Sequence, residues 1–191
     1  MRRYVMIFAV ALAAVLMLAG CGPDVTPPKD LLKVPETAEV SLEPIASPEP
    51  GFEVGSAMPD FSVPLAGGGT FTLSENLGKP VFINLFATWC GPCVGEMPEI
   101  DRLYQELSDQ VNFLVIDIGE DEQTALDFAE QNEYSLPFAY SLDGMPFGMG
   151  YLVYSIPRTF VLDADGVISA YYEGMRDYDT FKAAIQAALA H

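Results

Sequence analysis

The chain has 191 residues, of which 27 are acidic and 9 are basic, and its formal net charge is −18. Such an acidic surface repels nucleic acid and anionic lipid headgroups, and no nucleic-acid partner is therefore expected. With three cysteines and one histidine, the chain is also poor in the ligands of structural metal sites.

Residues 1–20 have the pattern of a secretory signal peptide. Arg2 and Arg3 provide the positive flank, and a run of fifteen apolar residues, Tyr4 to Leu18, follows them. That run is short for a membrane-spanning helix, which needs about 20 residues. Removal of the leader would leave 7 basic and 27 acidic residues, a net charge of −20. The pattern therefore predicts export from the cytoplasm.

Residues 21–54 are predicted to form a tether, because prolines and acidic residues recur throughout the segment. Proline stiffens a linker and like charges extend it, so the segment can reach on the order of 100 Å. The remaining residues, 55–191, are enough for one domain with a single hydrophobic core.

The pattern of residues 55–191 predicts an α/β domain with a mixed sheet and helices on both faces. Two short segments around three consecutive glycines, 60–65 and 70–73, predict an N-terminal β-hairpin extension. Apolar runs and alternating patterns predict strands at 81–86, 111–118, 138–141, 159–162 and 167–172. Helical periodicity predicts helices at 94–107, 121–132 and 178–190. The apolar and aromatic stretch 145–154 is expected to pack in the core or to help a partner dock.

Two cysteines, Cys90 and Cys93, stand where the predicted strand 81–86 leads into a helix. A thiolate at a helix N-terminus is stabilised by unpaired backbone N–H groups, which lowers a thiol pKa from about 8.5. Gly91 permits a tight entry into the helix, and Pro92 suits its first turn because it lacks an N–H. We expect an exposed Cys90 to attack a partner disulfide and a buried Cys93 to resolve the mixed disulfide.

Other uses of the cysteine pair are weaker. Structural zinc needs two more ligands, and the remaining candidates, Cys21 and His191, lie far away in the sequence. A passive disulfide around so small a loop stabilises a fold little. A copper carrier is an alternative because two thiols can hold Cu(I), although only Met97 lies nearby to complete such a site. No cofactor is expected besides a redox-active disulfide between Cys90 and Cys93.

The stretch Trp89-Cys90-Gly91-Pro92-Cys93 resembles the active-site motif of the thioredoxin superfamily. The longer match, from Asn84 through the motif to Glu96-Met97-Pro98, resembles the TlpA/ResA branch of membrane-tethered thiol–disulfide oxidoreductases. The stretches 57–61 and 156–163 are similar to the wider AhpC/TSA-redoxin group, which includes peroxiredoxins. The resemblance covers about residues 55–190 and implies a thioredoxin-like fold.

Four further residues take their expected roles from this resemblance. Pro157 matches a cis-proline whose loop faces the dithiol and pairs with the substrate backbone. Glu96 matches a glutamate that holds a proton near the pair or recognises a partner, although a solvated helix glutamate is an equal alternative. Trp89 is expected to shield the thiols and shape the docking surface. Asn84 stands where thioredoxins proper have a buried, proton-accepting aspartate, which favours the TlpA/ResA branch.

Leu18-Ala19-Gly20-Cys21 resembles the lipobox of bacterial lipoproteins, in which the cysteine is lipidated and becomes the new N-terminus. The resemblance implies a domain held outside the cytoplasmic membrane through Cys21. An uncleaved anchor helix with an incidental cysteine is the alternative.

These features together predict a membrane-anchored disulfide reductase. The Gly-Pro dipeptide resembles that of thioredoxin, whose potential is about −270 mV. By family analogy the clients are apocytochrome c and other extracytoplasmic proteins with disulfides, and a membrane thiol–disulfide electron donor keeps the pair reduced. The alternative is a peroxiredoxin-like peroxidase. That family has a threonine three residues before its reactive cysteine, whereas Ala87 stands there and Thr88 is one residue later.

Overall fold

The computed structural model describes residues 51–142 and 155–191. The predicted signal peptide, Cys21, most of the tether and the stretch 145–154 lie outside these ranges. None of the helices within them combines the length and the apolar character that crossing a membrane requires.

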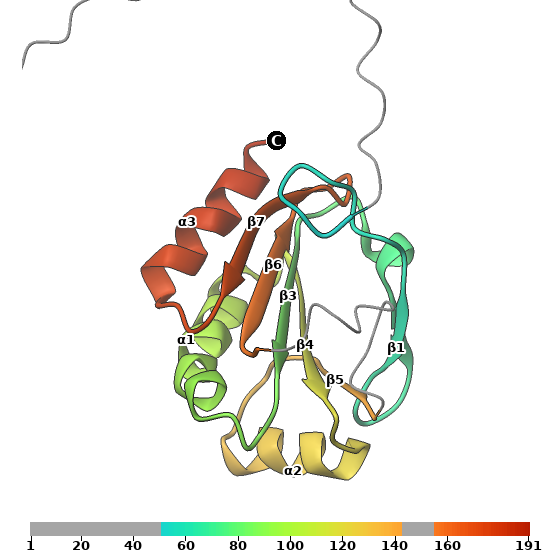
Figure 1. Ribbon diagram of the computed structural model, residues 1–191, viewed down its shortest axis with the longest axis vertical. Coiled ribbons are helices and arrows are strands. Elements are labelled where there is room, and N and C mark those ends of the chain that lie inside the picture. The colour runs from blue at the N-terminus through green and yellow to red at the C-terminus, as the bar shows by residue number, and fades with distance from the viewer. Residues whose placement is uncertain (1–50, 143–154) are drawn as a thin grey trace, which may run out of the picture. The chain divides into compact units, whose positions relative to one another are not determined.

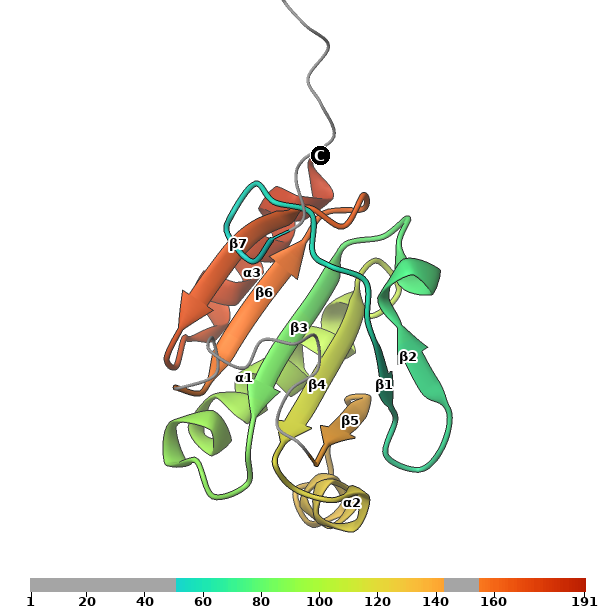
Figure 2. The ribbon, with the colours of Figure 1, turned by 45° about the vertical axis from the view of Figure 1, so that its right-hand side comes forward.

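A five-stranded mixed sheet forms the centre of the domain, as predicted, and Figure 2 shows it nearly face on. The strand order is β5-β4-β3-β6-β7, with β3 parallel to β4, β4 parallel to β5, and β6 antiparallel to both β3 and β7. The strands are β3 (Val81–Phe86), β4 (Asn112–Ile118), β5 (Phe138–Ser141), β6 (Arg158–Leu162) and β7 (Ile168–Glu173). All six residues of β3 are buried, as expected of a central strand covered on both faces.

Three α-helices pack against one face of the sheet, around a core that includes Phe82, Phe86 and Phe181. They are α1 (Gly91–Leu107), α2 (Glu122–Gln131) and α3 (Tyr178–Leu189). In Figure 1 α1 and α3 lie together on the side opposite to β1. The carboxylates of Asp121 and Asp177 cap α2 and α3 by accepting the backbone N–H three residues later, and such caps typically contribute about 1 kcal/mol.

The other face of the sheet is covered by the N-terminal hairpin rather than by an α-helix of the described residues. This hairpin consists of β1 (Ser62–Pro64) and β2 (Thr70–Thr72), and the 3₁₀ helix η2 (Leu73–Asn76) follows it. Phe61, Val63 and Phe71 pack there against the second core cluster. Within 51–142 and 155–191, the predicted mixed sheet flanked by helices is confirmed, but the three α-helices share one face, and the 3₁₀ helix η2 lies with the hairpin on the other. The parallel steps from β3 to β4 to β5 run in one direction, and right-handed crossovers then put α1 and α2 on the same face.

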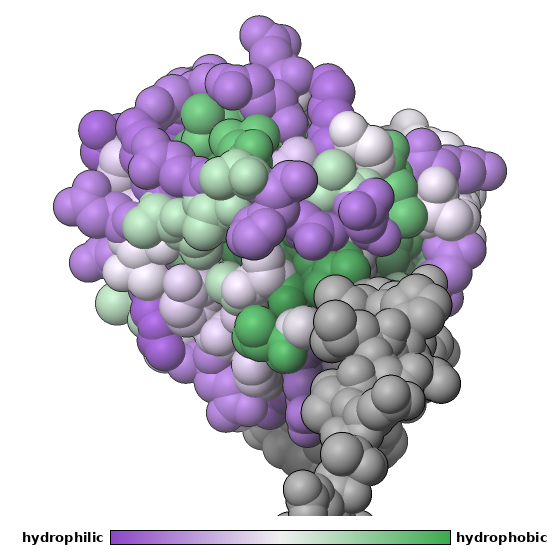
Figure 3. Space-filling model, turned by 90° about the horizontal axis from the view of Figure 1, so that it is seen from above, coloured by the Kyte–Doolittle hydropathy of each residue, from purple (hydrophilic) through white to green (hydrophobic). Residues whose placement is uncertain are grey.

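The topology brings three loops to one end of the sheet. β3 and β4 both end there because they are parallel, and β6 begins there because it is antiparallel to β3. The loops 87–90, 119–121 and 155–157 consequently meet at this end, which is where ligands bind in open α/β sheets. The opposite end, seen from above in Figure 3, is largely hydrophilic, and its hydrophobic areas are small and separate.

Candidate active site

Cys90 and Cys93 are joined by a disulfide at the N-terminus of α1, with their Cα atoms 5.3 Å apart. Cys90 is the N-cap residue, and Pro92 lies in the first turn. The Cys90 N–H donates to the Ala87 carbonyl at 3.0 Å, and the Cys90 carbonyl accepts from the Val94 N–H at 3.0 Å. The reduced Cys90 sulfur would therefore lie beside the unpaired N–H groups of the helix, as the sequence predicts.

The two cysteines differ less in exposure than expected. Cys93 is fully buried, but Cys90 is itself only 6% exposed. The prediction of an exposed Cys90 is thus wrong for this disulfide state, because the Cys90 sulfur lies against the loop before β6, 3.6 Å from the Ile156 carbonyl oxygen. Trp89 instead is 71% exposed, so the indole is a large apolar side chain of the motif that a partner can reach.

The Ile156–Pro157 peptide bond is cis, as the resemblance predicted. This bond belongs to the loop whose carbonyl contacts the Cys90 sulfur, so the expected proximity of the proline loop and the dithiol is confirmed.

Gly91 is the residue that is expected from the sequence to permit a tight entry into the helix. A Cβ at this position would have open space around it, so packing does not demand a glycine there.

Glu96 is buried, with 1% of its surface exposed, and the alternative of a solvated helix glutamate is therefore wrong. Its Oε1 accepts a hydrogen bond from the Asn84 Nδ2 at 2.8 Å, and its Oε2 accepts one from the Arg176 backbone N–H at 3.0 Å. Burial raises the pKa of this carboxyl to about 7, although both hydrogen bonds oppose the shift. Glu96 can therefore hold or release a proton near neutral pH, one helical turn after Cys93.

Asn84 connects this glutamate to the sheet. Its fully buried side chain donates from Nδ2 to Glu96 and also to the Thr159 hydroxyl, at 3.0 Å. An amide does not take up a proton at neutral pH, so at this position the side chain orients the neighbouring carboxyl and leaves proton binding to Glu96.

Two members of this network were not predicted. Thr159 faces Asn84 because the two residues are paired in register between β6 and β3. It could have been found from the match at 156–163, which contains it. Arg176 contributes a backbone N–H from the loop before α3, 80 residues from Glu96, and no side-chain pattern marks such a donor.

A groove of about 370 Å³ lies beside α1, on the side of Glu96 and Arg176. Met175, which is 54% exposed, contributes an apolar side chain to its wall. A Cβ on Gly95 would come within 3.2 Å of the Met175 sulfur, so glycine allows this loop to lie against α1. The groove is lined by Gly95, Glu99, Met175, Arg176, Asp177 and Thr180.

Metal ligands do not converge in the described ranges, where no group of three or more His, Cys, Asp and Glu side chains is placed to hold an ion. The chemistry that the arrangement supports directly is the opening and closing of the disulfide between Cys90 and Cys93, with an ionisable carboxyl nearby.

Comparison with known proteins decides the family. The Redoxin family matches residues 53–186. The chain belongs to the Redoxin family. Among its relatives, the thioredoxin-like protein YneN of Bacillus subtilis (strain 168) is 33% identical over 127 residues, which are 66% of this chain and 75% of YneN. The thiol-disulfide oxidoreductase ResA of Geobacillus kaustophilus (strain HTA426) is 35% identical over 123 residues, which are 63% of this chain and 70% of ResA.

A solved structure agrees with these matches. It is that of a Chlorobium tepidum protein assigned provisionally as the thiol:disulfide interchange protein DsbE, with a TM-score of 0.65 and 25% identity, and the match covers 73% of this chain and 99% of that one. The resemblance to the TlpA/ResA branch and the thioredoxin-like fold are therefore confirmed. With its cysteine pair, this Redoxin-family chain is a thiol–disulfide oxidoreductase, which acts on proteins that contain disulfides.

Proposed function

We propose that the chain is a lipid-anchored, extracytoplasmic reductase of client-protein disulfides, with apocytochrome c as one client. The observation that carries this proposal is the disulfide between Cys90, at the N-cap of α1, and Cys93, one turn inside the helix. The oxidised pair is the product that such a reduction leaves behind. The proposed activity needs no cofactor besides this disulfide.

The reaction proceeds by two exchanges. The Cys90 thiolate attacks one sulfur of the client disulfide, which forms a mixed disulfide and releases the first client thiolate. The Cys93 thiolate then attacks the Cys90 sulfur, which forms the intramolecular disulfide and releases the second client thiolate. Two electrons pass to the client, whose two thiolates take up protons. A membrane thiol–disulfide donor returns two electrons to Cys90 and Cys93.

Glu96 is proposed to handle the proton of Cys93. Its carboxyl is buried one turn after Cys93 on the same helix, and burial brings its pKa to about 7. A carboxylate in this state can take a proton when the Cys93 thiol ionises for the second exchange and can give it up afterwards. Asn84 holds Oε1 of Glu96 at 2.8 Å and so fixes the orientation of the carboxyl.

The docking surface is proposed to consist of Trp89 and the cis-proline loop. The indole is exposed, and such aromatic side chains commonly anchor a partner at an interface. Pro157 is proposed to align the client backbone, because its loop touches the Cys90 sulfur through Ile156. The open space above Gly91 leaves room for the client beside the disulfide.

The direction of electron transfer and the location of the protein in the cell are proposed from the sequence. The Gly91-Pro92 pair resembles that of thioredoxin, a reductant at about −270 mV, far below a strong oxidant at about −120 mV. Lipidation of Cys21 after removal of residues 1–20 anchors the domain at the cell membrane, and the tether of residues 21–54 gives it reach.

Trapping tests the proposed reaction. The Cys93→Ser variant of the full chain retains the attacking thiol but cannot resolve the mixed disulfide, so cells that express it are expected to accumulate adducts that a reductant dissolves. The matched control is Cys90→Ser, which is expected to give no adducts because Cys93 is buried. Equal adduct levels in the two variants, or none in Cys93→Ser while the wild type reduces clients, would contradict the roles proposed.

A separate variant tests the anchor. Cys21→Ser removes the lipidation site and leaves the domain unchanged, so this variant is expected to leave the membrane fraction while the purified protein keeps its reductase activity. Retention in the membrane fraction would show that the leader itself is the anchor.

A further inference from the structure

The loop before Cys90 is held by a carboxylate from a different part of the chain. Thr88 donates its backbone N–H to Oε2 of Glu120 at 2.6 Å and its hydroxyl to Oε1 at 2.7 Å. Both donors of Thr88 thus go to both oxygens of one side chain, 32 residues away. Hydrogen bonds to an ionised carboxylate are short and about twice as strong as neutral ones, which agrees with these distances.

The position of Glu120 is set by the end of β4. Gly119 follows the strand with a φ of +88°, a left-handed conformation that glycine adopts without strain. The Gly119 N–H donates to the Ser141 carbonyl at 2.7 Å, which ties the turn to β5. Glu120 therefore projects from a turn fixed by the sheet, and Asp121, the cap of α2, follows at once.

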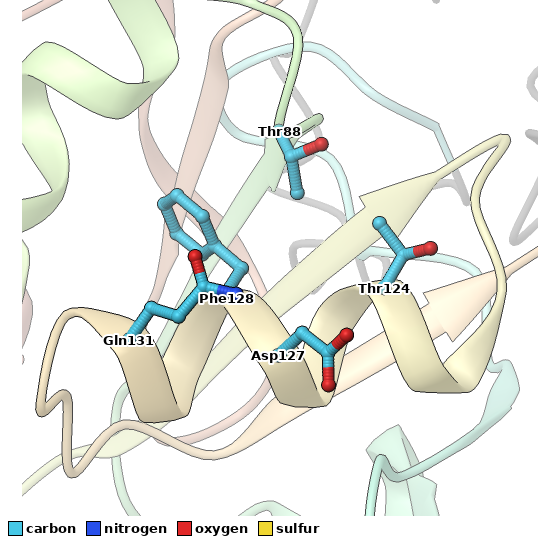
Figure 4. A pocket seen from close by; sticks show the side chains of 5 residues that line it. All are labelled: Thr88, Thr124, Asp127, Phe128 and Gln131. Carbon is cyan, nitrogen blue, oxygen red and sulfur yellow. The ribbon is translucent and has the colours of Figure 1, made fainter.

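On its other side, Thr88 faces a hollow rather than packed core. Figure 4 shows Thr88 on its loop opposite the side chains of α2. These residues line a pocket of about 270 Å³, whose other walls are Thr124, Asp127, Phe128 and Gln131. Packing around Thr88 is open on that side and Trp89 is largely exposed, so the two hydrogen bonds with the Glu120 carboxylate tie an otherwise open stretch of the loop to the end of β4.

We propose that Glu120 is a positioning residue for the dithiol: through its two hydrogen bonds with Thr88, it holds the loop 87–90 so that the Cys90 sulfur lies over the N-terminus of α1. This inference rests on the proposed thiol–disulfide exchange and adds a residue to its machinery. Glu120 does not touch the sulfurs. It acts through Thr88 and the turn that the Cys90 N–H closes on the Ala87 carbonyl.

The positioning role and a purely electrostatic role predict opposite effects. If Glu120 acted only by its charge, its removal would favour the Cys90 thiolate and speed the reaction of that thiol, because a nearby anion disfavours another. If Glu120 positions the loop, its removal lets Cys90 leave the helix N-terminus, the thiolate loses its N–H partners, and the reaction slows. Thr88→Val separates the two further, since it removes the hydroxyl bond without changing any charge.

The experiment measures alkylation of Cys90 by iodoacetamide at pH 7 in the reduced full chain. Glu120→Ala and Glu120→Gln are expected to slow it on the order of tenfold, which corresponds to a rise of about one unit in the thiol pKa. Thr88→Val is expected to slow it less, Thr88→Ser to restore most of the rate, and Thr88→Val added to Glu120→Ala to cost nothing more. The matched control is Glu130→Gln, the same change at an exposed position on α2, which is expected to leave the rate unchanged.

Rates in the Glu120 variants that equal or exceed those of the wild type and of Glu130→Gln would overturn the proposal. So would full additivity of Glu120→Ala and Thr88→Val. Alkylation does not depend on any client, so the result is separate from the trapping experiment. A wild-type chain that fails to reduce client disulfides but shows the alkylation contrast would overturn the proposed function and leave the positioning role supported.

Discussion

Replacement of Asp117 by asparagine is expected to change how the stability of the domain depends on pH. Asp117 lies on β4, and its side chain is fully buried beside the carboxylate of Glu120. Burial raises the pKa of this carboxyl from 3.8 to about 8, and the negative charge of Glu120, a hydrogen bond with the Glu120 carboxylate and the negative charge of Asp121 add to the shift. At neutral pH the folded protein therefore keeps a proton on Asp117 that the unfolded chain has released.

The direction and size of the effect follow from proton linkage. Between about pH 4 and pH 8 the folded state binds one more proton at Asp117 than the unfolded state does, so this group lowers the free energy of unfolding as the pH rises. The slope is about 1.4 kcal/mol per pH unit for one group. From pH 5 to pH 7 the free energy of unfolding should therefore fall by about 2.7 kcal/mol more in the wild type than in Asp117→Asn. Glu96 also titrates in this range, but it is present in both proteins and cancels in the comparison.

The assay is urea unfolding followed by circular dichroism at pH 5, 6 and 7, with linear extrapolation to water. The difference in slope is the test, because the buried amide has its own cost of about 1–3 kcal/mol at every pH. Asp109→Asn, the same change at an exposed position, should follow the wild-type curve. Parallel curves for Asp117→Asn and the wild type would show that Asp117 is not protonated in the folded protein, and the reasoning from burial would be refuted.

Three further substitutions test the core, the proton and the docking surface. The ring of Phe82 lies edge-on against Phe181 in the core, so Phe82→Ala should lower the free energy of unfolding by about 3–5 kcal/mol in urea titrations. Glu96→Gln should remove the inflection near pH 7 from the pH–rate profile of client reduction and slow the reaction at least about tenfold, and an unchanged profile would exclude Glu96 as the proton carrier. Trp89→Ala should slow client reduction but leave the rate of Cys90 alkylation unchanged. Its free energy of unfolding should stay within about 0.5 kcal/mol of the wild-type value, because the indole is exposed.

Local features of the sequence are enough for the strands, the helices and the redox pair. The run 81–86, which is apolar except for Asn84, predicts a buried segment, and its length is that of a strand. Because two residues separate Cys90 from Cys93, a disulfide can form within one helical turn whatever the rest of the fold. The cis bond before Pro157 was predictable only through family resemblance, because the residues themselves favour trans.

The surroundings of the pair depend on residues that are distant in the chain. Glutamate is a residue type typical of exposed helix surfaces, so the sequence around Glu96 gives no sign of its burial. The burial follows from the loop at Arg176 and from Asn84 on β3. The contact of Thr88 with Glu120 likewise requires β3 and β4 to end side by side. The strand order, which the pattern of strands does not specify, also decides that α1 and α2 share one face.

By itself the sequence determined which cysteines pair and which segments form the sheet, since both follow from spacing and periodicity within a few residues. Only the tertiary structure decided which carboxyls lose their water. Glu96 and Asp117 titrate far from their usual range because strands and loops from elsewhere in the chain bury them, and desolvation is a property of the assembled fold.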